Sequence, residues 1–338
     1  MKKEIDLFIR VEANQVIGAG HLQRIANILN HMPKSVRLHM IISLSDMAKN
    51  IINLNIHSHI FIYDISKGAD FSRFMLGRKS SEDALAFIKY LEKSQSNNIY
   101  VIADNYGIDE QWISMVRNHC EKLSVIDDYR NRYLPADVVI DPTPGVTLSS
   151  YRSLVSRHSK VLAGKNYNLI PEHYFDSFSW KGSRKSLLIS FGGGRYAETF
   201  FRQVDLSFIA KELDINILSD PFKTKIECNF LGFVGGYNDV ATSYKYHIGA
   251  LGQSSIERIA MRIPSINIVI EDNQKYIYNF FNAQFPDVTF RPNDISKEKI
   301  ITAFEQINSD IWYEKFLEKS RQLYSGTGIP LVVNSIID

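Results

Sequence analysis

Residues 5–24, IDLFIRVEANQVIGAGHLQR, decide the fold of this chain. Apolar side chains alternate over residues 5–11, which is the period of a β-strand. A Gly18-Ala19-Gly20 turn interrupts the strand, and apolar residues then recur with helical spacing from Leu22 until Pro33 ends the helix. A strand that turns through glycines into a helix predicts the first unit of a parallel α/β sheet.

The same alternation continues along the chain. Strand-like apolar runs separated by helical patterns occupy residues 36–43, 59–64, 99–104, 123–127 and 138–141, and one of the helices follows a Ser80-x-x-Asp83 capping sequence. After a polar, basic segment at 176–185, the pattern restarts with a strand at 186–191, a helix through Phe200, a helix at 254–262, a strand at 266–270 and a helix at 273–284. This order predicts two doubly wound, Rossmann-like domains. We place them at 1–172 and 186–338, joined by a linker at 173–185 and facing each other across a cleft.

Length and composition agree with a globular two-domain protein. The chain has 338 residues, of which 45% are hydrophobic and 22% charged, and this excludes disordered and low-complexity classes. A net charge of +2 is too balanced for a protein that binds nucleic acid mainly by neutralising phosphates. The sequence has neither an apolar run long enough for a membrane span nor the apolar core of a signal peptide near its start. We therefore expect a cytoplasmic monomer that has no membrane span and does not bind nucleic acid.

The turn that contains Gly18 and Gly20 leads into a helix with His21 in its first turn. Gln23 stands where a dinucleotide fingerprint needs its third glycine, and the ending of a phosphate loop is absent. At the positive end of a helix dipole, imidazolium is disfavoured and a neutral imidazole remains available as a base. His21 is thus a candidate general base, although a histidine that only caps or packs is the alternative.

Asp104 and Tyr106 follow the strand at 99–104 and are predicted to lie at the same edge of the sheet. Asp104 can orient a base or bind a sugar hydroxyl, and Tyr106 offers a hydroxyl and a stacking face. A helix-capping turn is the alternative for this segment. Adjacent strand side chains point to opposite faces, so Asp127-Asp128 is predicted to cap a helix or to pair with Arg130 or Arg132.

In the second half, glycines and hydroxyl residues mark a possible nucleotide site. Gly192 and Gly193 follow a strand and permit close backbone approach to a ligand. The segment Gly252-Gln253-Ser254-Ser255-Ile256-Glu257 opens a helix, so its N–H groups and hydroxyls can bind a diphosphate, and Glu257 one turn later can accept both ribose hydroxyls. Asn273 and Gln274 carry amides for sugar or phosphate oxygens. Ordinary helix capping is the alternative for both helix starts.

Several motifs in the same order resemble one known enzyme family. They are Arg10-Val11-Glu12-Ala13-Asn14, Ile17-Gly18-Ala19-Gly20-His21-x-x-Arg24, Asp104-x-Tyr106-Gly107-Ile108-Asp109 with Trp112, Val125-Ile126-Asp127-Asp128, Gly164-x-x-Tyr167-x-Leu169-Ile170, Ser190-Phe191-Gly192-Gly193, Ser254-Ser255-x-Glu257 and Asn273-Gln274. Over residues 5–285 the chain resembles the UDP-sugar hydrolases of pseudaminic acid biosynthesis. These enzymes release UDP from UDP-2,4-diacetamido-2,4,6-trideoxy-β-L-altropyranose.

The resemblance implies the GT-B architecture of the glycosyltransferase that adds GlcNAc to lipid II precursors. It implies that His21 deprotonates a water that attacks the anomeric carbon opposite UDP, with Asp104 and Tyr106 orienting His21 or the sugar. Glu257 would hold the ribose and the backbone of 252–256 the diphosphate. The remaining substrate-binding positions that it implies are Arg10, Gly18, Gly20, Arg24, Gly192, Gly193, Gly252, Ser254, Ser255, Asn273 and Gln274. Because UDP is a good leaving group, neither a metal nor another cofactor is expected.

The chain departs from the family at several places: Glu12 replaces the usual Asp, Asn14 replaces the usual Ser, and the segment 141–145 differs from the usual Asn-rich one. Pro171 stands where the family has Arg, and Gly194-Arg195 stands where it has Ser/Thr-Asp. Two other functions therefore stay open. One is a GT-B glycosyltransferase that uses a UDP-sugar donor, and the other is a non-catalytic paralogue that binds a nucleotide sugar.

Overall fold

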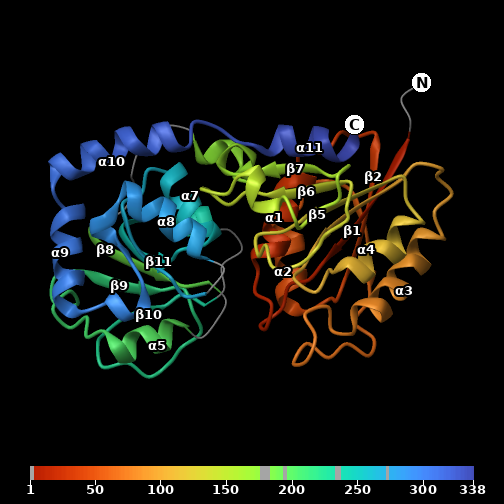
Figure 1. The fold of residues 1–338 in the computed structure, drawn as a ribbon. Coiled ribbons are helices and arrows are strands. Elements are labelled where there is room, and N and C mark those ends of the chain that lie inside the picture. Colours follow the sequence, from red (N-terminus) through yellow and green to blue (C-terminus); the bar gives the residue numbers. More distant parts are fainter. Residues whose placement is uncertain (1–3, 176–182, 193–195, 233–236, 272–273) are drawn as a thin grey trace. The chain divides into compact units, whose positions relative to one another are not determined.

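The computed structural model describes residues 4–175, 183–192, 196–232, 237–271 and 274–338. The chain forms two compact units (Figure 1). Unit 1 contains Met1–Leu169 together with Gly328–Asp338, and unit 2 contains Ile170–Thr327. The sequence placed all of 186–338 in the second domain, whereas the last eleven residues, Gly328–Asp338, belong to unit 1.

Unit 1 is built on a parallel sheet. In its described residues the sheet has seven strands in the order β3-β2-β1-β4-β5-β6-β7. Their bounds are β1 (Ile5–Val11), β2 (Val36–Ile42), β3 (Ile60–Asp64), β4 (Ile99–Asp104), β5 (Lys122–Ile126), β6 (Val138–Asp141) and β7 (Lys160–Ala163). Every pairing between them is parallel, which confirms the predicted α/β class and places the carboxyl ends of all strands at one edge.

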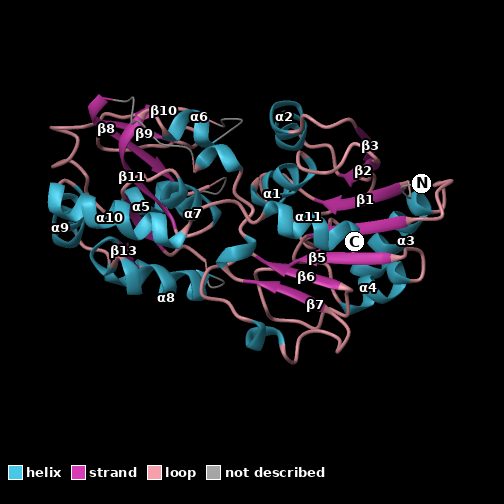
Figure 2. Ribbon diagram, turned by 90° about the horizontal axis from the view of Figure 1, so that it is seen from above, coloured by secondary structure: helices cyan, strands magenta, loops and turns pink. Residues whose placement is uncertain are grey.

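Helices cover both faces of this sheet. Helices α1 (Gly20–Leu29) and α2 (Asp46–Asn55) share one apolar core with α11 (Ile329–Ile337), which lies over β4, β5 and β6 (Figure 2). Helices α3 (Ser80–Leu91) and α4 (Glu110–Arg117) pack on the opposite face around Phe87 and Trp112. Val332 and Ile336 of α11 are buried in the first core. Burial of this apolar helix is the physical reason that the C-terminal segment returns to unit 1.

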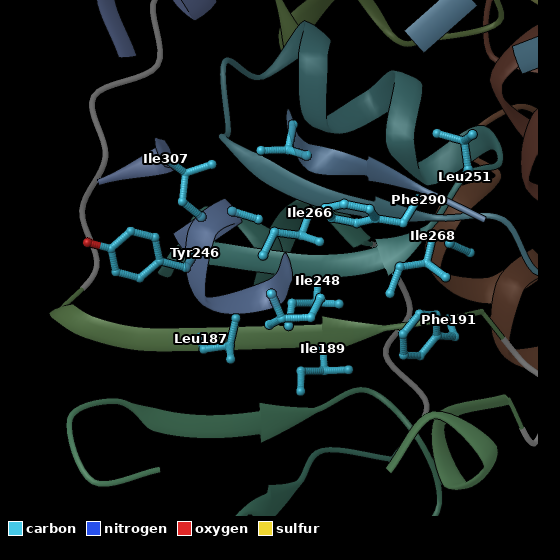
Figure 3. Packing of buried hydrophobic residues seen from close by; sticks show 14 of the residues in the cluster. Leu187, Ile189, Phe191, Tyr246, Ile248, Leu251, Ile266, Ile268, Phe290 and Ile307 are labelled. Carbon is cyan, nitrogen blue, oxygen red and sulfur yellow. The ribbon is translucent and has the colours of Figure 1, made fainter. Parts of the chain in front are cut away.

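Unit 2 is also built on a parallel sheet with helices packed against it. Its described strands follow the order β10 (Asn229–Phe230), β9 (Asp214–Ile217), β8 (Ser183–Ser190), β11 (Tyr244–Ala250), β12 (Ser265–Ile268) and β13 (Thr289–Phe290), all parallel. Its helices are α5 (Tyr196–Gln203), α6 (Tyr237–Ala241), α7 (Gln253–Ala260), α8 (Lys275–Gln284), α9 (Lys297–Ile307) and α10 (Asp310–Leu323). Leu187, Ile248 and Ile266 of the central strands form the middle of its core (Figure 3).

Some predicted boundaries shift. Helix α1 ends at Leu29 rather than at Pro33, and α7 runs from Gln253 to Ala260 rather than over 254–262. Within the predicted linker, 176–182 lie outside the described residues, and β8 already begins at Ser183. No helix in the described ranges has both the length and the apolar character that crossing a bilayer requires.

The predicted Ser80-x-x-Asp83 cap is wrong. Helix α3 is preceded by Lys79 as its N-cap residue, with no side-chain hydrogen bond there. Asp83 is fully buried instead, and it accepts hydrogen bonds from Arg10 and from Trp112 Nε1. A carboxylate partner stabilises the buried charge of Arg10, and this pairing takes precedence over local capping here.

Candidate active site

The carboxyl ends of β1 and β4 bring two predicted residues together. The two strands are parallel neighbours, with Val11 beside Asp104, and α1 begins shortly after β1. Nδ1 of His21 lies 2.7 Å from Oδ1 of Asp104. His21 is 6% exposed and Asp104 is fully buried, so water screens this contact little.

Arg24 completes the cluster from the next turn of α1. Its Nε and Nη2 each lie 2.5 Å from the Asp104 carboxylate, one on each oxygen. Its Nη1 donates to Oδ2 of Asp128 at 2.7 Å. Burial would raise the pKa of Asp104, but the charges and hydrogen bonds of Arg24 and His21 hold it below its ordinary value. Asp104 is therefore a carboxylate at neutral pH.

The ionised state of Asp104 determines which ring nitrogen of His21 carries the proton. A carboxylate only accepts, so Nδ1 of the imidazole must carry the hydrogen that it donates to Asp104. The Arg24 Nη2 atom, 3.1 Å from Nδ1, then faces another donor and makes no hydrogen bond to the ring. This tautomer leaves the lone pair on Nε2, where a neutral histidine can accept a proton.

Tyr106 connects the imidazole to the second carboxylate. Its ring meets the His21 ring edge to face, with centroids 4.7 Å apart, and its hydroxyl hydrogen-bonds to Asp128. Burial, followed by the negative charge of Asp128, raises the pKa of Tyr106, so the phenol stays neutral and donates. Burial opposes ionisation of Asp128 as well, but Arg24 chiefly lowers its pKa to about 2.

Asp128 was not predicted as part of the site. The expectation that Asp127 and Asp128 turn apart is confirmed, because Asp127 pairs with Arg132 at 2.9 Å while Asp128 reaches Arg24. The sequence held one signal for it. Asp128 follows β5, which neighbours β4 in the sheet, and hence lies at the same edge as Asp104.

The glycine turn sets the entry into α1. Oδ1 of Asn14 accepts hydrogen bonds from the backbone N–H groups of Val16 and Ile17, and Gly18 N–H donates to the Asn14 carbonyl at 2.7 Å. Gly18 has φ +84°, a backbone conformation that favours glycine. Gly20 is the first residue of the helix, and a Cβ atom there would meet no atom within 4 Å apart from its chain neighbours and the backbone of its own helix.

Arg10 is separated from this cluster. Its guanidinium is fully buried and pairs with Glu12 at 2.6 Å and Asp83 at 2.8 Å. Ser43 also donates to Glu12, so the charges in this network are satisfied by the protein itself. The structure thus gives Arg10 structural partners rather than a place beside His21.

In unit 2, several predicted binding residues meet at the start of α7. Gly252 is the extended N-cap residue, and a Cβ atom there would lie 3.7 Å from Nε2 of Gln274. Oε1 of Gln274 accepts from Ile270 N–H at 2.8 Å, so this amide binds the backbone that follows β12. Ser255 donates its hydroxyl to the Gly252 carbonyl at 2.6 Å, whereas Ser254 is only partly buried.

Glu257 lies one turn into α7 and is 6% exposed. Burial raises the pKa of Glu257 to about 7, although the charge of Arg258 acts in the opposite direction. Gly192 follows β8 with φ +80°. Gly193, Asn273 and the divergent pair Gly194-Arg195 lie outside the described residues. In the ranges that are described, no three His, Cys, Asp or Glu side chains gather as a metal-binding group.

Comparison with known proteins gives the fold. No protein-family profile and no curated protein matches the sequence. Among solved structures, the chain is similar to UDP-GlcNAc 2-epimerase from Neisseria meningitidis bound to UDP-GlcNAc, with TM-score 0.67, 12% identity and coverage of 98% of this chain and 99% of that one. It is similar to Medicago truncatula UGT71G1 complexed with UDP-glucose, with TM-score 0.62, 12% identity and coverage of 100% and 99%. It is also similar to Acinetobacter baumannii MurG, with TM-score 0.58, 11% identity and coverage of 99% of each chain. These likenesses span nearly the whole chain, and the fold is GT-B.

Proposed function

We propose that this protein is an enzyme that releases UDP from a UDP-linked 2,4-diacetamido-2,4,6-trideoxy sugar, by inverting attack of water at the anomeric carbon. The observation that carries the proposal is the 2.7 Å contact between His21 Nδ1 and a buried, ionised Asp104. The motif resemblance points to the sugar. The likeness to structures that contain UDP-GlcNAc or UDP-glucose supports a UDP-sugar as the substrate class.

His21 acts as the general base. Asp104 fixes the imidazole in the Nδ1–H tautomer, so Nε2 can accept a proton from water. As Nε2 takes the proton, an imidazolium forms next to the Asp104 carboxylate, which stabilises it as in other histidine–aspartate pairs. The new C–O bond forms on the side of the sugar opposite UDP, so the configuration at the anomeric carbon inverts.

The start of α7 receives the leaving group. The backbone N–H groups of the first turn after Gly252 have no acceptor within the helix, so they can bind an anion, and the helix dipole would stabilise its charge. Fixed dipoles of this kind absorb the charge that develops on UDP, so the departing phosphate needs no strong general acid. Glu257 in its ionised form accepts the ribose hydroxyls. The first unit supplies the base and the second the nucleotide site, and we propose a cytoplasmic monomer that needs no cofactor.

A UDP-release assay tests the proposal. The purified protein is incubated with the UDP-linked diacetamido sugar and, separately, with UDP-GlcNAc, each with and without added hydroxyl acceptors. We expect equal amounts of UDP and free sugar from the diacetamido substrate without any acceptor. The proposal would be contradicted if the protein released no UDP from the diacetamido substrate, or released it only when an acceptor was added.

A glycosyltransferase is the second candidate. It is favoured by the likeness to MurG and by Pro171, which replaces the arginine of the resembling hydrolases and serves as the N-cap residue of a short turn at Glu172–Tyr174. In that case a sugar or lipid hydroxyl takes the place of water at His21. UDP release that depends on the acceptor identifies the transferase, and UDP binding without turnover identifies the non-catalytic paralogue.

A further inference from the structure

Arg258 of α7 is a buried cation without an anionic partner. It is 1% exposed, and none of the ion pairs among the described residues includes it. Nη2 donates to the Ala250 carbonyl at 3.0 Å and to Oδ1 of Asn267 at 2.8 Å, while Nε has no hydrogen-bond partner. A buried charge is costly unless it is paired. The position of this guanidinium therefore calls for an explanation.

Strand β11 leaves space for the guanidinium of Arg258. Gly249 of β11 has no side chain, and a Cβ atom there would lie 2.7 Å from Nη1 of Arg258. The charge also acts on its neighbours. Burial, and then the nearby guanidinium, lower the pKa of His247 to about 3. His247 is thus neutral, and Tyr237, which lies 3.0 Å from its Nδ1, is a neutral phenol. These neutral groups do not balance the positive charge of Arg258, and the carboxyl that this charge acts on, Glu257, has its pKa raised to about 7 by burial and forms no ion pair with it among the described residues.

The guanidinium reaches the helix start through Ser254. Its Nη1 lies 3.4 Å from Ser254 Oγ, in the first turn of α7. Because a guanidinium only donates, Ser254 Oγ accepts this bond and its own O–H is available to a second acceptor. No hydrogen bond among the described residues has Ser254 as its donor, whereas the hydroxyl of Ser255 is already bound to Gly252.

We propose that Arg258, acting through Ser254, supplies the positive charge that holds the diphosphate of the nucleotide at the start of α7. The inference rests on the proposed function, which identifies the anion as a diphosphate. A phosphate oxygen bonded to Ser254 would lie at most about 6 Å from Nη1, which is the sum of the 3.4 Å contact and a hydrogen bond of about 2.8 Å. At that separation in a partly buried site, the attraction corresponds to roughly 10- to 100-fold in affinity.

Calorimetry on the full chain tests this role with three probes: UDP, inorganic pyrophosphate and uridine. Arg258→Met removes the charge, Arg258→Lys retains it, and Ser254→Ala removes the connecting hydroxyl. Arg321→Met, an exposed position of α10, is the control for the change in net charge. We expect Arg258→Met to weaken UDP and pyrophosphate about 10- to 100-fold and uridine less than about 3-fold. Arg258→Lys should lose less, and Ser254→Ala should add little to Arg258→Met.

Unchanged UDP affinity in Arg258→Met, or equal losses for UDP and uridine, would overturn the inference. If thermal melting shows that Arg258→Met does not fold, Ser254→Ala decides, and wild-type UDP affinity in that variant would also overturn it. A further outcome is that wild-type protein binds pyrophosphate but not UDP, while Arg258→Met weakens the binding of pyrophosphate. That combination would contradict the proposed function and still support this anion site. Wild-type protein that binds neither would contradict both.

Discussion

The carboxylate of Asp104 accepts a hydrogen bond from Nδ1–H of His21, with 2.7 Å between Nδ1 and Oδ1. Arg24 also donates to each oxygen of that carboxylate, at 2.5 Å. The imidazole is thereby fixed in both orientation and tautomer before any substrate arrives. Such preorganisation is what a general base needs, since the geometry does not have to be created during the reaction.

Asp104→Asn is expected to lower kcat for UDP release by roughly 10³- to 10⁴-fold, because an asparagine amide no longer selects the Nδ1–H tautomer. UDP affinity should stay within about 3-fold, since the proposed nucleotide site lies in the other unit. Steady-state kinetics and calorimetry check the two halves of this prediction. His21→Ala gives the kcat that remains without the general base. A near-normal kcat in Asp104→Asn would remove Asp104 from the mechanism.

Asp128→Asn is expected to lower kcat roughly 10- to 100-fold with little change in KM. The substitution removes the charge that pairs with Arg24 and replaces the charged acceptor of the Tyr106 hydroxyl by a neutral amide oxygen, and hydrogen bonds to charged groups contribute about 1.5–3 kcal/mol. Asp128→Glu should recover part of the rate, and Tyr106→Phe should cause a smaller loss. An Asp128→Asn enzyme whose KM rises while kcat is unchanged would show that Asp128 acts on substrate binding instead.

Glu257→Gln is expected to stabilise the ligand-free protein at pH 8 but not at pH 4. The folded-state pKa of Glu257 is about 7, against an ordinary value of 4.5, so the folded state binds more protons between these values. Stability of the wild type therefore falls as the pH rises from 4.5 to 7, by about 3 kcal/mol for this group. Gln cannot ionise and avoids that loss. Urea unfolding at both pH values measures the difference, with the exposed Glu271→Gln as control; equal stability of wild type and Glu257→Gln at pH 8 would contradict the assignment.

UDP release is expected to proceed at the full rate in excess EDTA. The start of α7 and Arg258 provide the positive charge that the diphosphate needs in this account. The assay compares initial rates before and after chelation, followed by addition of magnesium or manganese. Loss of activity in EDTA with recovery on adding either ion would indicate a metal-dependent transferase.

The sequence was informative where chemistry follows a regular element. The turn after β1 and the end of β4 were recognisable from hydrophobic period and glycine content, so His21 and Asp104 could be predicted as neighbours at one sheet edge. The pairing of Arg24 with Asp128 could not, because it joins α1 to a strand two positions away in the sheet and depends on tertiary register. Likewise, the residues of α11 follow the second half along the chain and were assigned to that domain, and only their burial shows that they belong to unit 1.

Turnover in ¹⁸O-labelled water tests the central claim most directly. Attack of a His21-activated water at the anomeric carbon breaks the bond between that carbon and the phosphate oxygen, so the label enters the released sugar. We predict one ¹⁸O atom at the anomeric carbon of the free sugar, measured by mass spectrometry before ring-opening exchange, and unlabelled UDP. Label in the phosphate of UDP, with an unlabelled sugar, would contradict this account.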